Sequence, residues 1–565
     1  MNWQREAVAY QIYPRSFKDS NGDGIGDLQG IIEKLDYLKD LGIDLIWISP
    51  IYKSPNDDNG YDISDYKDIL DEFGTMEDFD KLLKEVHKRG MRLIMDLVIN
   101  HTSDEHPWFI EAKSSKDSPK RDWYIWKKGK KPVSFSEGSV QEEEEGVEPN
   151  NWASIFGGSA WEYDSHSEEY YLHLFSKKMP DLNWENEKLR NALYEMINWW
   201  LDKGIDGFRV DAISHIKKCD YEDMPNPDNL KYVPSFDKQM KQPGIEKLLQ
   251  DLKENTFDKY DPFTIAEASG VTTEDLEEWA GNEKGKFSMV FQFEHMHLWE
   301  MDKTEKSPLS YIKKTLSRWQ EAVYKDGWIG LFLENHDLTR SVSKLGNDKE
   351  YWKESAKALG LMYFMQMGTP FIYQGQEIGM INADYDNIED FNDVATIYQY
   401  KERVEQGMSE EESLEIVKGT TRDNSRTPMQ WNNTDNGGFT TGTPWINVNG
   451  NHKNINVEEQ LKDEDSILNF YKEMIKLRKE NKSLVYGKYE LILEDDDNIY
   501  AYTRTLKDEK YIVITNISEE NIKFNYEKET LKYENLCLSN YKVNNHKNIS
   551  EFILKPYEAR LYKLD

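Results

Sequence analysis

The stretch that organises this chain is Gly204-Ile205-Asp206-Gly207-Phe208-Arg209-Val210-Asp211-Ala212-Ile213-Ser214-His215. A glycine-flanked entry is followed by a short apolar run, which predicts a buried strand that ends at Asp211. Residues i and i+2 of a strand face the same side, so Arg209 and Asp211 would point together from its end. The pair is either a structural ion pair or a carboxylate held ionised and aimed at a substrate. The rest of the chain favours the second interpretation.

Apolar runs alternate with segments of helical periodicity along most of the chain. Helices are predicted at 28–41, 76–88 and 187–202. Eight strands are predicted, at 7–13, 45–50, 91–98, 207–211, 263–266, 287–291, 329–333 and 370–373. Eight strand–helix units predict an α/β fold, a closed (β/α)8 TIM barrel whose active site lies at the carboxyl ends of the strands.

Two regions depart from this alternation. After the third strand the chain becomes polar and loop-rich and contains the acidic run Glu142–Glu145, which predicts a small inserted subdomain. Near the C-terminus, segments 499–504 and 511–517 alternate as β-strands do and predict an all-β sandwich domain. The predicted domains are the catalytic barrel at 1–101 and 171–485, the inserted subdomain at 102–170 and the sandwich at 486–565.

The composition limits the partners that we expect. The chain has 71 Lys and Arg against 105 Asp and Glu, a net charge of −34, which disfavours nucleic acid and anionic membranes as partners. Cys219 and Cys537 are the only cysteines, so no disulfide framework is expected. The N-terminus lacks the features of a signal peptide, and no apolar run is long enough to span a membrane. We therefore expect a cytoplasmic protein, monomeric or a weak homo-oligomer.

Charged and polar side chains follow several of the predicted strands. Clustered carboxylates raise one another's proton affinity, so one can stay protonated while another stays ionised, as glycoside hydrolysis requires. A metal site is the alternative, but the two histidines lack the tight spacing of a zinc motif, and Arg209 would disfavour a cation. A glycosidase is therefore favoured over a metallohydrolase. The strand-end residues are Asp96, His101, Arg209, Asp211, Glu267, Asn335, His336 and Asp337.

The loop from Asp19 to Asp27 alternates oxygen-bearing side chains with glycines, a pattern that suits a hard cation such as Ca²⁺. Its opening matches an EF-hand loop, but the twelfth position is Gly30, so the bidentate glutamate is missing. An Asx-rich turn is the alternative. We expect a structural Ca²⁺ site that includes Asp19, Asn21, Asp23 and Asp27, and no organic cofactor.

Five blocks of sequence carry a resemblance to a known family. They are residues 96–101, 207–211, 334–337, 368–379 and 422–431. These blocks resemble the alpha-amylase family, glycoside hydrolase family 13, and in particular the branch of oligo-1,6-glucosidases, maltases, dextran glucosidases and trehalose-6-phosphate hydrolases. The similarity extends from Trp3 into the C-terminal domain.

The resemblance implies an exo-acting, retaining alpha-glucosidase that releases glucose from the non-reducing end of short alpha-glucosides. Asp211 would be the nucleophile that forms a covalent glucosyl-enzyme. Glu267 would be the general acid and then the base, and Asp337 would bind ring hydroxyls. The resemblance also implies a lid-like insertion at about 376–440, after the eighth strand.

Further substrate contacts are implied in the same way. Arg209, His101 and His336 would bind the sugar or orient the carboxylates. Tyr61 would stack on the non-reducing glucose, while Asp62 and Arg426 would cap its far hydroxyls and close the pocket. Two positions complete the implied set: Phe156 as a substrate contact, and Ile25 as a Ca²⁺ ligand through its backbone carbonyl.

The sequence departs from the family pattern at three places. Met179 stands where the family usually has Gln, and Glu267 is followed by Ala-Ser-Gly where isomaltose-cleaving relatives often have Met-Pro-Gly. Ala212 follows the nucleophile. In this branch of the family, Val at that position tends to accompany α-1,6 cleavage, whereas a small residue or Thr tends to accompany α-1,4 cleavage. We therefore expect maltose-type or mixed linkage specificity, with oligo-1,6-glucosidase or trehalose-6-phosphate hydrolase activity as alternatives.

Other functions are less well supported by the sequence. Transglucosylation or sucrose isomerisation could use the same intermediate, but Leu338-Thr339-Arg340-Ser341 lacks the arginine-rich motif expected of isomaltulose synthases. A catalytically inactive member, such as a transporter heavy-chain ectodomain, would lose the carboxylates and carry a membrane anchor. A carbohydrate-binding module would need neither an acid nor a nucleophile.

Overall fold

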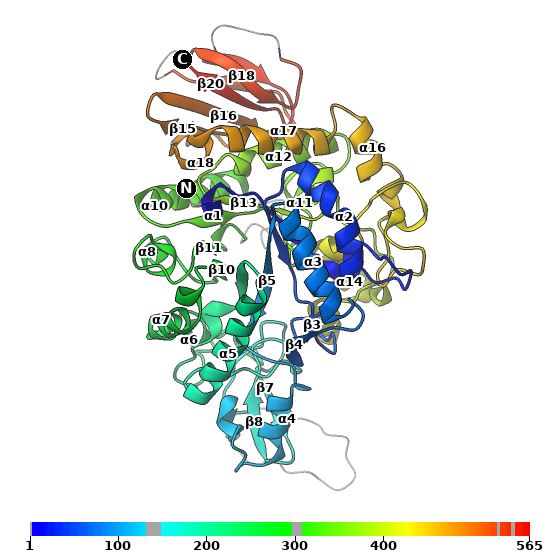
Figure 1. Ribbon diagram of the computed structural model, residues 1–565, viewed down its shortest axis with the longest axis vertical. Coiled ribbons are helices and arrows are strands. Elements are labelled where there is room, and N and C mark those ends of the chain that lie inside the picture. The colour runs from blue at the N-terminus through cyan, green and yellow to red at the C-terminus, as the bar shows by residue number, and fades with distance from the viewer. Residues whose placement is uncertain (1–2, 131–147, 297–307, 528–530, 544–548) are drawn as a thin grey trace.

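The computed structural model describes residues 3–130, 148–296, 308–527, 531–543 and 549–565 (Figure 1). The predicted (β/α)8 barrel is confirmed, because eight parallel strands close into a ring in the order β1-β13-β12-β11-β10-β9-β5-β2. Consecutive barrel strands are therefore neighbours. The barrel strands are β1 (Ala9–Ile12), β2 (Leu45–Ile48), β5 (Arg92–Val98), β9 (Gly207–Asp211), β10 (Phe263–Glu267), β11 (Met289–Phe291), β12 (Ile329–Leu331) and β13 (Thr369–Tyr373).

Helices follow the barrel strands and surround them (Figure 1). Two of the predicted helices, α2 and α3, have the predicted bounds, and Gly42 ends α2 in the left-handed conformation that favours glycine. Among the described helices, none has the length and apolar character needed to cross a membrane. The longer barrel helices are α2 (Leu28–Leu41), α3 (Met76–Lys88), α5 (Glu187–Lys203), α7 (Ile245–Asn255), α10 (Pro308–Lys325), α12 (Trp352–Phe364) and α17 (Ile467–Glu480).

Shorter helices fill the connections. The α-helices are α1 (Trp3–Glu6), α4 (Pro107–Ser114), α6 (Phe236–Gln239), α8 (Leu276–Ala280), α11 (Ser341–Leu345), α13 (Val394–Glu405), α14 (Glu410–Thr420), α15 (Asp423–Arg426), α16 (Val457–Lys462) and α18 (Lys482–Tyr486). The 3-10 helices are η1 (Pro14–Ser16), η2 (Arg121–Trp123), η3 (Ile213–His215), η4 (Phe257–Lys259), η5 (Glu294–Met296), η6 (Gln376–Ile378), η7 (Ile388–Asp390), η8 (Asp435–Gly438) and η9 (Gly450–Lys453).

Strand β9 lies between β5 and β10, and two glycines shape its entry. Gly204 ends α5 with φ of 101°. Gly207 has φ of 147°, and a Cβ there would lie 1.8 Å from the carbonyl oxygen of Phe263, so only glycine fits. Arg209 is in register with Asp96 on β5. The glycine-flanked entry that predicted the strand thus permits close packing of neighbouring barrel strands.

The inserted subdomain lies at one end of the long axis of the molecule and the C-terminal domain at the other (Figure 1). Trp152 and Trp161 are central to a small apolar core of the subdomain. The acidic run Glu142–Glu145 lies outside the described residues. The three-stranded sheet of the subdomain contains β6 (Trp126–Lys127), β8 (Glu169–Leu172) and β7 (Trp161–Asp164). Strands β3 (Tyr52–Lys53) and β4 (Asp65–Ile69) form a separate pair.

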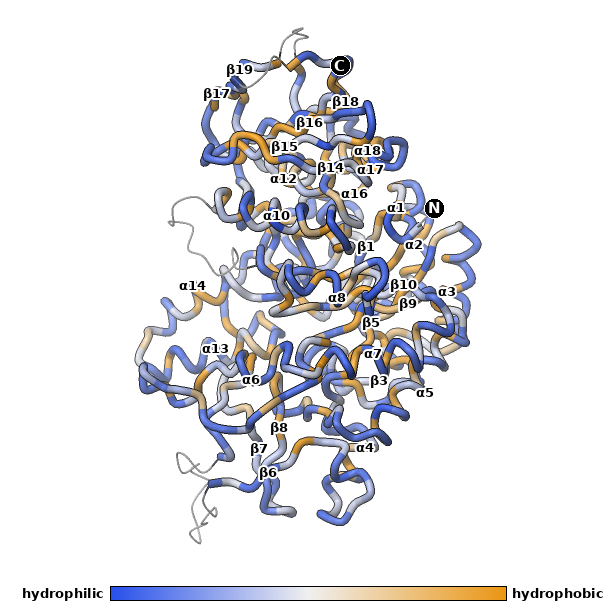
Figure 2. The backbone as a smooth tube through the Cα atoms, turned by 90° about the vertical axis from the view of Figure 1, so that its left-hand side faces the viewer, coloured by the Kyte–Doolittle hydropathy of each residue, from blue (hydrophilic) through white to orange (hydrophobic). Residues whose placement is uncertain are grey.

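The predicted C-terminal β domain is confirmed as a five-stranded antiparallel sheet with a two-stranded ribbon against it. Along β15, Tyr500 and Tyr502 face the barrel core, whereas Ile499 and Ala501 join a core shared with Phe524 of the ribbon. In Figure 2 the tube of this domain carries both orange, hydrophobic stretches and blue, hydrophilic ones. The sheet order is β14 (Lys488–Ile492), β15 (Ile499–Leu506), β16 (Glu509–Asn516), β20 (Ala559–Leu564) and β18 (Tyr533–Ser539), and the ribbon pairs β17 (Ile522–Asn525) with β19 (Glu551–Leu554).

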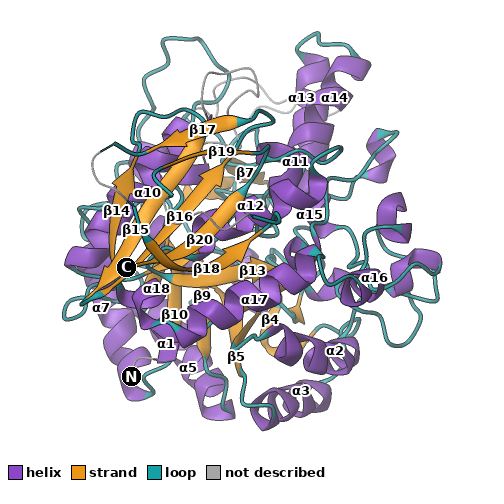
Figure 3. Ribbon diagram, turned by 90° about the horizontal axis from the view of Figure 1, so that it is seen from above, coloured by secondary structure: helices purple, strands orange, loops and turns teal. Residues whose placement is uncertain are grey.

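The segment after β13 leaves the barrel before α17 completes the ring of helices. Within it, α13 and α14 pack against each other at the edge of the molecule (Figure 3). Their small apolar core includes Tyr385, Phe391 and Val417. The position of this segment agrees with the expected insertion, while its role as a lid and the exact domain boundaries stay predictions.

Candidate active site

A cavity of about 200 Å³ lies at the carboxyl ends of the barrel strands. It collects side chains from segments that are hundreds of residues apart in the sequence. The lining residues are Asp58, Tyr61, His101, Phe156, Phe175, Met179, Asp211, Ala212, Glu267, His336, Asp337 and Arg422. The three predicted catalytic carboxylates therefore share one pocket.

Arg209 lies beneath this pocket and connects three carboxylates. Its Nη1 donates to Asp96 Oδ1 at 2.6 Å and to Asp211 Oδ1 at 2.7 Å, and its Nη2 donates to Glu267 Oε2 at 2.7 Å. The side chain is 2% exposed, so these are buried charge-assisted hydrogen bonds. One planar guanidinium thus fixes Asp211 and Glu267 relative to each other.

Asp96 supports Arg209 from the neighbouring strand. Its Oδ2 accepts hydrogen bonds from Trp47 Nε1 at 3.1 Å and from the Tyr61 hydroxyl at 3.0 Å. Burial raises the pKa of Asp96 to about 6, even though Arg209 and these donors act in the opposite direction. Asp96 does not line the cavity, so it orients Arg209 and Tyr61.

Asp211 sits in an environment that favours its protonated form more than water does. Burial raises its pKa well above the usual range, Arg209 opposes this, and the negative charges of Glu267 and Asp96 add to it. Glu267 Oε2 also accepts a hydrogen bond from the backbone N–H of Ala212 at 2.8 Å. Ala212 reaches this geometry with φ of 43°, a left-handed conformation that is uncommon for a residue with a Cβ. The strand end is therefore shaped around the two carboxylates.

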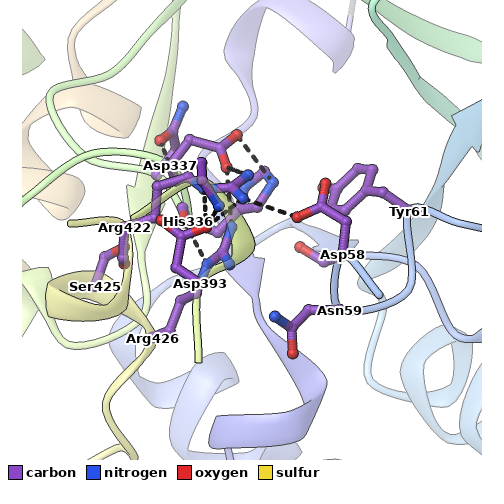
Figure 4. A network of polar contacts seen from close by, with 12 residues as sticks. Asp58, Asn59, Tyr61, His336, Asp337, Asp393, Arg422, Ser425 and Arg426 are labelled. Carbon is purple, nitrogen blue, oxygen red and sulfur yellow. Dashed lines mark hydrogen bonds and ion pairs between the residues drawn. The ribbon is translucent and has the colours of Figure 1, made fainter. Parts of the chain in front are cut away.

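Asp337 carries a stable negative charge on the opposite side of the cavity. Although burial alone would raise its pKa, His336, Arg422 and Arg426 hold the pKa of Asp337 well below its usual range. Its Oδ1 lies 3.3 Å from Arg422 Nη1 and 3.2 Å from Arg426 Nη2, and its Oδ2 lies 3.1 Å from His336 Nε2 (Figure 4). Asp337 is thus ionised and held by three groups.

The two pocket histidines are neutral hydrogen-bonding groups. Burial lowers the pKa of His336 to about 3 and that of His101 to about 4. The Gln11 amide nitrogen lies 2.8 Å from His336 Nδ1, so Nδ1 accepts and Nε2 carries the proton that faces Asp337. His101 Nε2 is buried without a hydrogen-bond partner among the described residues, which leaves it for a ligand hydroxyl.

Tyr61 forms a flat wall of the pocket, and its stacking on glucose stays a prediction. Its ring stacks on His336 with centroids 5.1 Å apart and an interplanar angle of 6°, and its hydroxyl is held by Asp96. Phe156 and Phe175 form another apolar wall with their ring centroids 5.5 Å apart. These rings supply flat surfaces of the kind that stack on sugars.

The prediction for Asp62 is wrong. Asp62 is fully buried beside the cavity and accepts hydrogen bonds from Ser54 Oγ and from the backbone N–H groups of Asp57 and Asp58. Burial raises its pKa to about 6. Its carboxylate therefore shapes the loop, and Asp58 lines the pocket in its place.

The prediction that Arg426 caps the pocket is also wrong, because Arg426 does not line the cavity. Arg426 is 1% exposed and reaches Asp337 from behind, with Nε bonded to the His336 carbonyl at 3.0 Å. Arg422 is the arginine that lines the pocket, and its Nη2 donates to Asp58 Oδ1 at 2.8 Å (Figure 4). Arg422 opens the 422–431 block, so the resemblance located the segment but not the residue.

The loop proposed to bind Ca²⁺ is held together by its own hydrogen bonds. Asp19 accepts from the backbone N–H groups of Asn21, Gly22 and Gly24 and from Thr440 Oγ1. Asp27 accepts from Ser20 and caps α2 through Gly30 N. Within the described ranges, no group of three His, Cys, Asp or Glu side chains is placed as a metal cluster. The oxygen-rich residue types still suit a hard cation, so Ca²⁺ stays a prediction.

Comparison with known proteins agrees with this fold. The family model "Alpha amylase, catalytic domain" matches residues 11–487. The chain is 55% identical to the "Probable oligo-1,6-glucosidase 3" of Bacillus subtilis strain 168, over 99% of each chain. Among solved structures, trehalose-6-phosphate hydrolase from Bacillus licheniformis matches with a TM-score of 0.89 and 45% identity, over 100% of this chain and 99% of that one. Trehalulose synthase from Pseudomonas mesoacidophila MX-45 matches with a TM-score of 0.93 and 40% identity over the whole of both chains.

These findings define the class of enzyme. A barrel with paired carboxylates in a closed pocket is a glycoside hydrolase arrangement, and the extent of the matches leaves no large part of the chain unaccounted for. The chain belongs to the alpha-amylase family, within which it is a glucosidase.

Proposed function

We propose that this enzyme is an exo-acting, retaining alpha-glucosidase. The observation that carries the proposal is the guanidinium of Arg209, which binds Asp211 and Glu267 through its two terminal nitrogens at 2.7 Å each. Two carboxylates on one guanidinium fit the close spacing of a retaining pair, roughly 5–5.5 Å, better than the wider spacing of an inverting pair.

The reaction follows from these positions. Glu267 donates a proton to the glycosidic oxygen while Asp211 attacks the anomeric carbon, so the bond to the leaving group breaks as the glucosyl–aspartate bond forms. A water molecule then attacks the anomeric carbon, Glu267 accepts its proton, and Asp211 is released. Arg209 favours the ionised form of Asp211 that attacks, and Asp337 binds hydroxyls of the distorted ring.

The far side of the pocket supports exo action. Arg422 bonds to Asp58 and Asp337 at once, so these three charged side chains form one connected wall of the cavity (Figure 4). A sugar whose 4- and 6-hydroxyls face such a wall cannot continue as a chain beyond it. The enzyme would therefore remove single glucose units from the non-reducing end of short alpha-glucosides.

The linkage that it cleaves is less directly supported. One relative is named a probable oligo-1,6-glucosidase, which supports α-1,6 cleavage, whereas the small side chain of Ala212 in the pocket supports α-1,4 or mixed cleavage. In the described lining, Arg422 is the only lysine or arginine, and it pairs with carboxylates, which gives no support to a phosphorylated disaccharide. We propose mixed specificity for maltose- and isomaltose-type substrates.

Substitution of the two carboxylates tests the mechanism. We expect Asp211→Asn to lower kcat by about 10⁴-fold or more on every α-glucoside. Glu267→Ala should lose activity on maltose but keep rapid first-step release of 4-nitrophenol from its α-glucoside, because that leaving group needs no proton. Retention is checked by NMR of the first glucose anomer released. An Asp211→Asn variant that keeps wild-type activity, or release of β-glucose, would exclude the proposal.

Linkage is tested at Ala212. Initial rates on maltose, isomaltose, sucrose and trehalose 6-phosphate define the wild-type preference. Ala212→Val should then raise the isomaltose-to-maltose ratio of kcat/KM by about 10-fold, since a change of two methyl groups in a pocket has effects of this size. Ala212→Gly, which suits the same backbone conformation, should leave the ratio near that of the wild type. Equal ratios in all three proteins would remove Ala212 from the account of specificity.

We also propose the loop 19–27 as a Ca²⁺ site, with Asp19, Asn21, Asp23, Asp27 and the Ile25 carbonyl as ligands. Its support is the alternation of oxygen donors along a tight loop. Addition of Ca²⁺ after chelation should raise the melting temperature of the wild type but not of Asp23→Ala. An equal response of both proteins would reject the site. Cytoplasmic localisation and a monomeric or weakly oligomeric state stay predictions.

A further inference from the structure

A tight turn of the inserted subdomain carries Phe156 to the mouth of the pocket. The turn closes on itself, because Ser154 N donates to the Gly158 carbonyl at 2.9 Å and Gly157 N donates to the Ser154 carbonyl at 3.0 Å. The Phe156 N–H donates to Ser154 Oγ at 3.2 Å. Phe156 therefore follows any movement of the two glycines beside it.

Tyr398 of α13 lies directly on this turn. A Cβ added to Gly157 would be 2.4 Å from Tyr398 Cε1, and one added to Gly158 would be 2.6 Å from the Tyr398 hydroxyl. Both glycines have positive φ, 106° and 73°, so a side chain is excluded by conformation as well as by space. The ring of Tyr398 thus packs on bare backbone, although the two partners are over 200 residues apart in the sequence.

Helix α13 is connected to the pocket through Asp393 and Arg422. Asp393 is its N-cap, accepting from Ala395 N at 3.2 Å, and the same Oδ1 accepts from Arg422 Nε at 3.0 Å. The guanidinium carbon of Arg422 lies 4.8 Å from the ring centroid of Phe156. Arg422 therefore contacts Phe156, Tyr398 contacts the turn that carries it, and Asp393 connects Arg422 to the helix of Tyr398.

We propose that Tyr398 is a positioning residue that holds Phe156 against Arg422 and so sets how tightly the pocket binds its sugar. The inference rests on the proposed α-glucosidase function. Phe156 lines the pocket and Tyr398 does not, so Tyr398 acts on the substrate through Phe156. Its side chain is 39% exposed, which makes it replaceable without opening the core.

Substitution of Tyr398 tests the proposal through the division between KM and kcat. Tyr398→Ala should raise KM for maltose by about 5-fold and leave kcat within about 2-fold, because Phe156 would no longer be held against Arg422 when the sugar binds. Tyr398→Phe keeps the ring on Gly157 and should restore the wild-type KM. Tyr324→Ala, an exposed tyrosine on α10, is the matched control and should change neither constant.

A double-mutant cycle with Gly157→Ala tests the contact itself. In the wild type, the new methyl group meets the Tyr398 ring and should raise KM. In Tyr398→Ala the ring is gone, so the same substitution should have a smaller effect on KM. The backbone strain at Gly157 is present in both backgrounds and cancels in the cycle.

Two results would overturn the proposal. One is an unchanged KM in Tyr398→Ala, with or without a lower melting temperature, since a merely structural residue would alter stability alone. The other is an additive cycle, which would show that Gly157 and Tyr398 are not coupled. Both results are read only if the wild type hydrolyses maltose. A wild type without this activity, or an Asp211→Asn variant that keeps it, would instead refute the proposed function.

Discussion

Two groups of arginines compensate their charge in different ways. At the pocket, Arg209 and Arg422 bind carboxylates. At the junction between the barrel and the C-terminal domain, Arg478 of α17 and Arg504 of β15 bind only backbone carbonyl oxygens in the described structure. The acceptors are those of Phe364, Gln366, Gly368 and Leu484 for Arg478, and of Met365, Leu484, Val485 and Gly487 for Arg504.

The junction arginines bind where helices end. Helices α12 and α18 end at Phe364 and Tyr486, and the last carbonyls of a helix lack partners and carry partial negative charge. The partial charges of these carbonyl groups replace only part of the hydration that each guanidinium loses. Burial accordingly lowers the pKa of Arg478 to about 9 and that of Arg504 to about 10. Arg504 links the C-terminal sheet to barrel carbonyls, and neither guanidinium has a carboxylate partner in the described structure.

The pocket arginines behave in the opposite way. Although burial alone would lower it, the carboxylates around Arg209 raise the pKa of its guanidinium well above the usual range. Arg209 in turn favours the ionised forms of Asp96 and Asp211. Removing a pocket arginine should therefore change the chemistry as well as the stability, whereas removing a junction arginine should change stability alone.

The largest expected effect is that of Arg209→Met. Near neutral pH it should lower stability by about 3–5 kcal/mol, because three acids lose a buried counter-charge, and should reduce kcat/KM by about 10³-fold. The folded-state pKa values of Asp96 and Asp211 would rise further above their unfolded values. The stability deficit should then shrink as the pH falls and the acids take up protons. Urea unfolding at several pH values measures this, and a deficit that does not vary with pH would contradict the charge argument.

Asp58→Asn and Asp62→Asn form a matched pair within one loop. Asp58→Asn weakens the wall made with Arg422 and should lower kcat/KM by about 30-fold, the value of a hydrogen bond to a charged group. Asp62→Asn disturbs three buried hydrogen bonds and should cost about 1–3 kcal/mol of stability with KM unchanged. Kinetics and thermal unfolding of both variants separate the two roles. The reverse assignment would restore Asp62 as the substrate residue.

Arg504→Met examines the junction. It leaves several buried carbonyl oxygens without a donor and should lower stability by about 2–4 kcal/mol. Both kcat and KM should match the wild type at temperatures where the variant is folded. Thermal unfolding and kinetics at 25 °C check this. A large change in KM would show that the two arginine groups are coupled through the barrel.

The smallest expected effect is a shift in the pH profile of Asp96→Asn. The negative charge of Asp96 contributes to the raised pKa of Asp211. The nucleophile must be ionised, so wild-type activity should fall on the acid side at a pH above the usual range of an aspartate. Removing the Asp96 charge should move that acid limb of kcat/KM to lower pH. A limb that stays in place or moves to higher pH would argue against this electrostatic link.

Local patterns accounted for much of the site. Arg209 and Asp211 were predicted to point together because alternate residues of a strand do, and Glu267 and Asp337 because they follow strands of the same sheet. The errors at Asp62 and Arg426 have a different origin. The loop contains Asp57, Asp58 and Asp62, and their directions depend on left-handed residues at Asn56, Asn59 and Gly60 that are stabilised by the surrounding structure.

Periodicity and strand ends are short-range properties, and they were enough to predict the barrel, the C-terminal β domain and the three carboxylates. That Asp58 and Arg422 form the wall of the pocket follows only from the folded chain. The same is true of the raised pKa values of Asp96 and Asp211, and of the contact between Tyr398 and Gly157. These properties depend on burial and on contacts between distant segments, and no local pattern encodes them.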